Sequence, residues 1–143
     1  MPNPLGKKSP APAVLLLDDN HEYRQTMAMM LRREGYRVMQ AEKSAALEKT
    51  RTDPPALVLM ELTTNSANDF ELASQLQVAR SNSAIPVVYY ATEEIKNQIS
   101  DSTVEVLAKP IPATRVGETL RRHLSEFPDR PRPIASPGFT ASK

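Results

Sequence analysis

Short apolar runs alternate with segments of helical periodicity along most of this chain. Five runs predict strands: AVLLL (13–17), YRVMQA (36–41), ALVLMEL (56–62), IPVVYYA (85–91) and TVEVLA (103–108). The first and third are almost continuously apolar, a pattern typical of strands that are buried on both faces of a parallel sheet.

Between the runs, apolar residues recur every three or four positions, which predicts helices. Asn20 is the expected N-cap of the first helix and Gly35 its end, and Ser44 is the expected cap of a short second helix. The remaining helices are predicted over 70–79, 93–100 and 113–124. Because 93–100 has only two apolar anchors, we expect the fourth helix to be short or irregular.

This alternation of strand and helix predicts an α/β fold, in which right-handed crossovers cover both faces of a parallel sheet. The polar residues that do the work of such a fold gather at the carboxyl ends of the strands, where the strand order reverses. Those strand ends are therefore the first place to look for chemistry.

Composition narrows the classes of protein. The chain has 143 residues and no cysteine, and the lack of cysteine excludes a disulfide framework and a thiolate zinc site. Its net charge of +1 does not favour nucleic-acid binding. No apolar run approaches the roughly 20 residues of a membrane span. Eight of the 13 prolines lie in 1–12 and 125–143, so we expect two disordered tails around one domain at 13–124, in a cytoplasmic protein.

Charged residues follow three of the predicted strands. Asp18 and Asp19 follow the first, Glu61 ends the third, and Lys109 follows the fifth. If these strands are neighbours, three carboxylates meet one ammonium group. Clustered carboxylates repel, which raises their pKa values unless cations compensate. Lys109 supplies one positive charge, and a hard divalent ion such as Mg²⁺ would supply the rest.

The segments VLLLDDN, PALVLMEL, IPVVYYAT and VLAKPI, in this order, resemble the receiver domain of two-component response regulators over about 13–124. The resemblance implies a flavodoxin-like (βα)5 three-layer sandwich with a five-stranded parallel sheet. It also implies Mg²⁺ binding by Asp18, Asp19 and the backbone carbonyl of Thr63. Lys109 matches the family's phosphate-pairing lysine, and Glu61 stands where the family has its phosphoacceptor aspartate.

The chain departs from this pattern at the positions that sense phosphate. Glu61 carries its carboxylate about 1.5 Å further out than an aspartate would, and a misplacement of about 1 Å can cost ~100-fold in rate. Ala91 replaces the usual hydroxyl residue, with Thr92 one place late, and Val106 replaces the switch aromatic.

We therefore expect a pseudo-receiver: a signalling protein-interaction module of a two-component or phosphorelay pathway, neither phosphorylated nor an enzyme. It should require no cofactor and should bind Mg²⁺ weakly through Asp18, Asp19, Glu61 and Thr63. Two alternatives remain open: a Mg²⁺-dependent acyl phosphate on Glu61, and a constitutively active phospho-mimic. A flavin- or nucleotide-binding flavodoxin-like protein is disfavoured, because DDNHE stands where a phosphate-cradling loop would be needed.

Each site residue also has a purely structural interpretation. Asp18 and Asp19 would cap the first helix and pair with Lys109, and Glu61–Lys109 would be a static ion pair. Tyr89 and Tyr90 should point to opposite faces of their strand, with Tyr90 filling space beside Ala91. The two histidines, His21 and His123, are expected at the surface.

The expected partner is a histidine kinase or another signalling protein, or a second copy of the chain in a homodimer; neither nucleic acid nor a membrane is expected. By resemblance to the family, the partner would meet a surface made by the fourth helix, the fifth strand and the last helix. The candidate residues on that surface are Ile95, Ile99, Val104, Arg115, Glu118 and Arg122.

Overall fold

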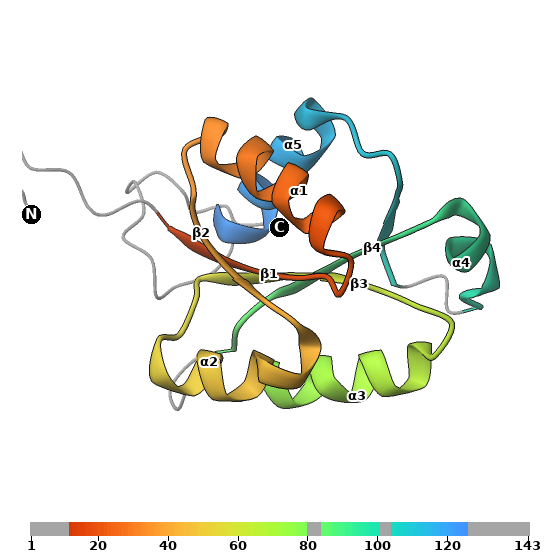
Figure 1. The fold of residues 1–143 in the computed structure, drawn as a ribbon, viewed down its shortest axis with the longest axis horizontal. Coiled ribbons are helices and arrows are strands. Elements are labelled where there is room, and N and C mark those ends of the chain that lie inside the picture. The colour runs from red at the N-terminus through yellow and green to blue at the C-terminus, as the bar shows by residue number, and fades with distance from the viewer. Residues whose placement is uncertain (1–11, 80–83, 101–103, 126–143) are drawn as a thin grey trace, which may run out of the picture.

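The computed structural model describes residues 12–79, 84–100 and 104–125 (Figure 1). Its strands are β1 (Ala13–Leu17), β2 (Arg37–Ala41), β3 (Leu57–Glu61), β4 (Val87–Ala91) and β5 (Val106–Ala108). Its helices are α1 (His21–Arg33), α2 (Ala46–Thr52), α3 (Ser66–Gln77), α4 (Glu93–Gln98) and α5 (Ala113–Ser125), and a 3₁₀ turn, η2 (Lys43–Ala45), precedes α2. Both predicted tails lie outside the described residues, apart from Pro12 and Ser125.

The five strands are parallel and lie in the order β2-β1-β3-β4-β5. The predicted flavodoxin-like sandwich is confirmed. The order reverses between β1 and β3, so the carboxyl ends of these two strands border the crevice in which α/β proteins place their functional residues.

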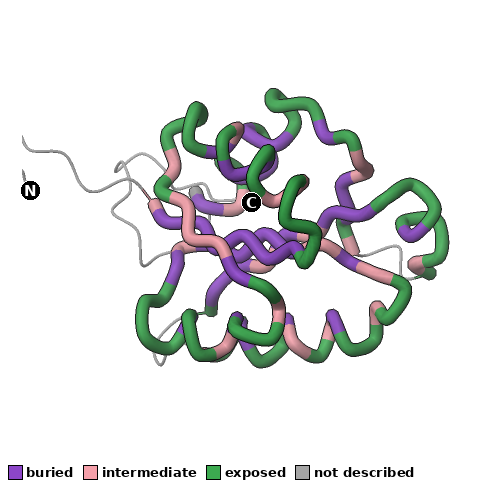
Figure 2. The backbone as a smooth tube through the Cα atoms, in the orientation of Figure 1, coloured by how far each residue is buried: buried purple, intermediate pink, exposed green. Residues whose placement is uncertain are grey.

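The continuous apolar strands are explained by two separate cores. On β1, Val14 and Leu16 pack with α1 and α5, whereas Leu15 and Leu17 pack with α2 and α3 on the other face. Figure 1 shows these helix pairs above and below the sheet, and Figure 2 shows the central strands almost entirely buried. Successive side chains of a strand point to opposite faces of the sheet, and both faces are covered by helices. Every position of a central strand is therefore apolar.

The fourth helix is short, as predicted. It has six residues and lies at the β5 end of the sheet (Figure 1). Its buried anchor, Ile95, packs in a small third cluster with Leu62, Ala91 and Val106. The predicted β5 is longer than the observed strand, since neither Val104 nor Glu105 belongs to it.

The predicted caps of the first helix are confirmed, and that of the second is wrong. The Asn20 side chain accepts a hydrogen bond from the Tyr23 N–H at 2.9 Å, and Gly35 follows α1 with φ of 98°. Ser44 lies inside η2, and α2 begins after Ala45 with no side-chain cap. The chain already turns before α2 begins, because the Ala45 N–H donates to the Glu42 carbonyl at 3.0 Å.

In the part of the chain that the structure describes, no helix is long and apolar enough to cross a membrane.

Candidate functional site

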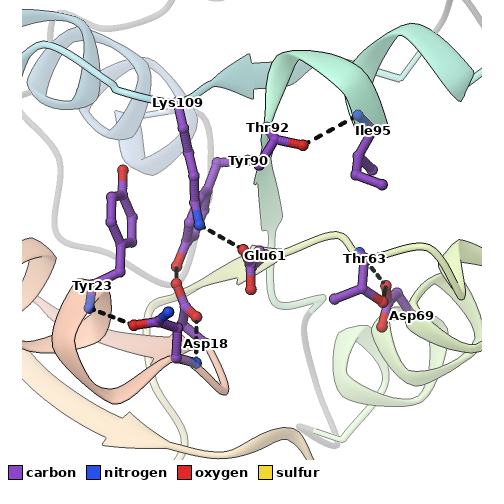
Figure 3. A network of polar contacts seen from close by, with 10 residues as sticks. Asp18, Tyr23, Glu61, Thr63, Asp69, Tyr90, Thr92, Ile95 and Lys109 are labelled. Atoms are coloured by element: carbon purple, nitrogen blue, oxygen red, sulfur yellow. Dashed lines mark hydrogen bonds and ion pairs between the residues drawn. The ribbon is translucent and has the colours of Figure 1, made fainter.

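One row of side chains crosses the carboxyl edge of the sheet. Glu61 and Tyr90 are register partners on β3 and β4, and Asp18 follows β1 directly beside Met60 and Glu61. Since side chains alternate between faces, these three face the same side, above Leu16, Leu59 and Val88 of the α1–α5 core. Figure 3 shows Lys109 reaching into this row from the end of β5.

Lys109 pairs with Glu61. The Lys109 Nζ lies 2.6 Å from the Glu61 Oε2, and about one sixth of each side chain is exposed. The same ammonium lies 4.1 Å from the centre of the Tyr23 ring and 5.6 Å from that of Tyr90. It is therefore held by one carboxylate and two aromatic faces at once.

Asp18 is fully buried and both of its carboxylate oxygens are engaged. One accepts from the Asn20 N–H at 2.8 Å, and the other accepts from the Tyr90 hydroxyl at 2.5 Å (Figure 3). The Asp18 backbone carbonyl accepts from Arg24 at 2.6 Å. Asp18 is thus satisfied internally, as a buried charge must be.

The electrostatics of the row follow from burial and from the proximity of two carboxylates. Burial raises the pKa of Glu61, the hydrogen bond from Lys109 opposes this, and the Asp18 carboxylate raises the pKa further. Burial and the same Asp18 charge raise the pKa of Tyr90 far above its ordinary value. The raised pKa favours the protonated hydroxyl, which donates to Asp18.

A second polar cluster joins the loops beside this row. Asp69 on α3 is buried; its Oδ1 lies 2.7 Å from the Lys43 Nζ, and its Oδ2 accepts from the Thr63 N–H at 2.8 Å and the Thr63 hydroxyl at 3.0 Å. The Lys43 backbone N–H donates to the Asp19 Oδ1 at 3.1 Å. Lys43 thus bridges the loop after β1 and the loop after β3.

Comparison with known families matches residues 14–121 to the response regulator receiver domain. The chain belongs to this family. No match was found among curated proteins.

Solved receiver structures share the fold. The receiver domain (CheY-like) from Methylobacillus flagellatus is 18% identical with a TM-score of 0.67, and the alignment covers 78% of this chain and 98% of that one. The receiver domain of a sensor histidine kinase from Pseudomonas aeruginosa PAO1, which has a magnesium ion coordinated in its active site cleft, is 19% identical with a TM-score of 0.66. That alignment covers 80% of this chain and 98% of the other.

In this receiver domain the residues predicted to bind Mg²⁺ are placed as follows. Asp18 and Glu61 lie together in the row, whereas Asp19 is exposed and bonded to Lys43, and the side chain of Thr63 is bonded to Asp69. Carboxylates and a carbonyl are suitable ligands for Mg²⁺. However, the described residues contain no group of three or more His, Cys, Asp or Glu side chains that could hold a metal ion. As arranged, they do not fit the ion, and Mg²⁺ binding stays a prediction.

The two switch positions carry side chains of a different chemistry from those that the resemblance implies. Ala91 is fully buried and has no hydroxyl, and Val106 packs against it in the third cluster. The Thr92 hydroxyl, one place later, caps α4 by accepting from the Ile95 N–H at 3.2 Å. It is therefore committed to the helix and not to the Glu61 side of the strand end (Figure 3).

The predicted partner surface contains a groove of about 270 Å³ between α4, β5 and the start of α5. Val106, Ala108, Ile111 and Pro112 contribute to its apolar wall, and Lys96 and Arg115 supply its cations. Of the predicted contact residues only Arg115 lines this groove.

The other predicted contact residues do not line the groove. Ile95 is buried, and Ile99 and Val104 are half-buried in the third cluster beneath the surface. Glu118 is exposed, and Arg122 bonds Glu105 at 3.0 Å.

Sequence reasoning missed the contacts that neutralise the site. Tyr23, Lys43 and Asp69 were not singled out, and the hydrogen bond of Tyr90 was not foreseen. The register rule could have found Tyr90, because a residue opposite Glu61 on the next strand must face the same side. His123 lies at the surface but is partly covered, with its Nε2 3.6 Å from Glu105.

Proposed function

We propose that this receiver domain is a protein-interaction module of a cytoplasmic two-component or phosphorelay pathway that works without being phosphorylated. The observation that carries the proposal is the Glu61–Lys109 pair at 2.6 Å. It joins the position of the phosphoacceptor to the lysine that, by family resemblance, would hold the phosphoryl oxygens.

The pair disfavours phosphoryl transfer for two reasons. Lys109 is already neutralised by Glu61, so it offers an incoming phosphoryl group little net charge. The extra methylene of Glu61 also moves its carboxylate away from the placement that the rest of the family's site demands, and catalysis depends steeply on placement.

The relay from the site to the surface is weakened as well. With Ala91 and Val106 at the switch positions, no hydroxyl closes on a phosphoryl group and no aromatic ring follows it. A fold that keeps its surface but loses this relay is suited to constitutive binding.

For the partner we propose another signalling protein, such as a histidine kinase, or a second copy of the chain. The groove between α4 and α5 supports this, because an apolar wall with two cations beside it suits an apolar side chain flanked by carboxylates.

The phospho-mimic is the second candidate, since Glu61 does contact Lys109. A carboxylate carries one negative charge where a phosphoryl group carries nearly two. Replacing Glu61 with Gln separates the two functions. For an interaction module, amide NMR shifts should stay close to Glu61 and Lys109. For a phospho-mimic, they should spread through Val106 into α5.

Phosphorylation tests the main proposal directly. The full chain is incubated with acetyl phosphate and Mg²⁺, and its intact mass is measured. We expect no added phosphoryl group on the unmodified protein or on Glu61→Gln. Glu61→Asp should take up a detectable fraction, the new carboxylate attacking phosphorus and releasing acetate. Incorporation into the unmodified protein that Glu61→Gln abolishes would overturn the proposal.

A further inference from the structure

The hydrogen bond between Tyr90 and Asp18 occupies one of the oxygens with which Asp18 would bind a metal ion. Asp18 is the buried member of the acidic pair, and its two oxygens already accept from the Asn20 N–H and the Tyr90 hydroxyl. We propose that Tyr90 is the residue that keeps Asp18 from binding a divalent cation, so that internal donors hold the strand ends together.

The position of Tyr90 makes this bond hard to break. The side chain is fully buried, and its ring packs against that of Tyr23 with centroids 5.8 Å apart. At 2.5 Å the hydroxyl–carboxylate distance is that of a charge-assisted hydrogen bond. The hydroxyl cannot swing away without moving a ring that is packed on several sides.

Each carboxylate of the row also has a hydrogen-bond donor without a metal. The carboxylates of Asp18 and Glu61 are neighbours, and one ammonium and one hydroxyl serve them: Lys109 for Glu61 and Tyr90 for Asp18. Asp19, the exposed member of the acidic pair, bonds the Lys43 backbone. A cation that coordinates Asp18 through its Oδ2 must therefore compete with the Tyr90 hydroxyl for that oxygen.

The adjacent tyrosine provides a matched control. Tyr89 points to the opposite face of β4, where its ring meets Phe70 edge-on at 5.2 Å. It is half-buried and none of its contacts reaches Asp18. Removing its hydroxyl changes the chemistry of β4 equally but leaves the row intact.

The inference concerns the same strand ends as the proposed function. It rests on the proposed function in one respect only: both take the strand-end side chains to stay in one arrangement. The two can fail separately. Phosphorylation of the unmodified chain would overturn the proposed function, whereas the present inference is decided by Mg²⁺ affinity alone.

The test is a backbone amide NMR titration of the full chain with Mg²⁺, performed on the unmodified protein, Tyr90→Phe and Tyr89→Phe. The signals followed are the amides of Asp18, Asn20 and Glu61. Losing a hydrogen bond to a charged group corresponds to about tenfold or more in an equilibrium constant. We expect Tyr90→Phe to bind Mg²⁺ at least about tenfold more tightly than the other two proteins.

Equal Mg²⁺ affinity in all three proteins would overturn the inference. So would an equal gain in both variants, because that would reflect general loosening of β4. If Tyr90→Phe does not fold, the hydroxyl proton signal of the unmodified protein still tests the inference. Its buried Tyr90 hydroxyl proton should give a slowly exchanging signal that disappears over the same Mg²⁺ range that shifts Asp18. An unchanged hydroxyl signal while the Asp18 amide shifts would refute this competition.

Discussion

The strand-end row and the groove beside α4 hold charged groups in opposite ways. In the row, Asp18, Glu61 and Lys109 are buried or nearly so, and each has a partner within the described structure. At the groove, Lys96 is exposed with no side-chain partner among the described residues, and Arg115 is 57% exposed and 4.0 Å from Glu105.

The difference agrees with the proposal that the groove, and not the row, meets a partner. Groups that are already paired in a buried row contribute to the fold and are unavailable to a ligand without a large cost. Exposed cations next to an apolar wall contribute little to folding, and a partner could reach them at a smaller cost. Substitutions that measure stability should therefore separate the two regions.

The largest effect is expected for Asp69, whose cluster braces the loops next to the row. Asp69→Ala should lower the free energy of unfolding by about 3 to 4 kcal/mol, because it leaves the Lys43 ammonium and the Thr63 N–H without their buried acceptor. Denaturant unfolding measures this. Glu71→Ala, two residues away on the exposed side of α3, should change stability by less than about 0.5 kcal/mol. Equal losses would mean that the cluster contributes nothing specific.

Within the row itself, Lys109→Ala should lower the free energy of unfolding by about 2 to 3 kcal/mol. Glu61 and Asp18 would then face each other without a cation, and two aromatic rings would lose the ammonium packed on them. Thermal and denaturant unfolding check the value against Lys49→Ala, which removes an exposed lysine from α2. Unchanged or raised stability would contradict the ion-pair interpretation of the row.

Glu105 is intermediate between the regions, since it pairs at the surface with Arg122, His123 and, more distantly, Arg115. The hydrogen bond from Arg122 lowers the pKa of Glu105. A carboxyl whose folded pKa is lowered stabilises the fold above its ordinary value of 4.5 and loses that contribution as the pH falls through the lower, folded value.

Glu105→Gln should therefore destabilise the protein at neutral pH by no more than about 1 kcal/mol, and the difference should vanish in acid. Unfolding curves of the two proteins at pH 7 and below pH 4 test this. A difference that persists or grows in acid would show that packing, not charge, is the role of Glu105.

The smallest effect is expected at Lys96. Lys96→Ala should change the free energy of unfolding by less than about 0.5 kcal/mol, because this exposed ammonium has no side-chain partner among the residues that the structure describes. A loss above 1 kcal/mol by denaturant unfolding would place Lys96 in the fold and remove the contrast between the groove and the row.

The sequence by itself determined the architecture and the content of the strand ends. Continuous apolar runs separated by segments of helical periodicity predict a parallel sheet covered on both faces. Asp18, Glu61 and Lys109 stand at the ends of three such strands, so they lie at one edge of the sheet. The N-cap at Asn20 was equally local, since it depends on the residues that follow within one turn.

Only the tertiary structure decided how those charges are satisfied. Tyr90 and Asp18 are 72 positions apart, and Lys43 and Asp69 are 26 apart. Even the α2 start depended on a 3₁₀ turn whose Lys43 backbone N–H bonds the side chain of Asp19. Periodicity assigns a residue to a face of its helix or strand. A hydrogen bond also requires its donor and acceptor to lie within about 3 Å of each other. Strand register, ring packing and side-chain rotamers set that distance, and they are fixed only when the chain has folded.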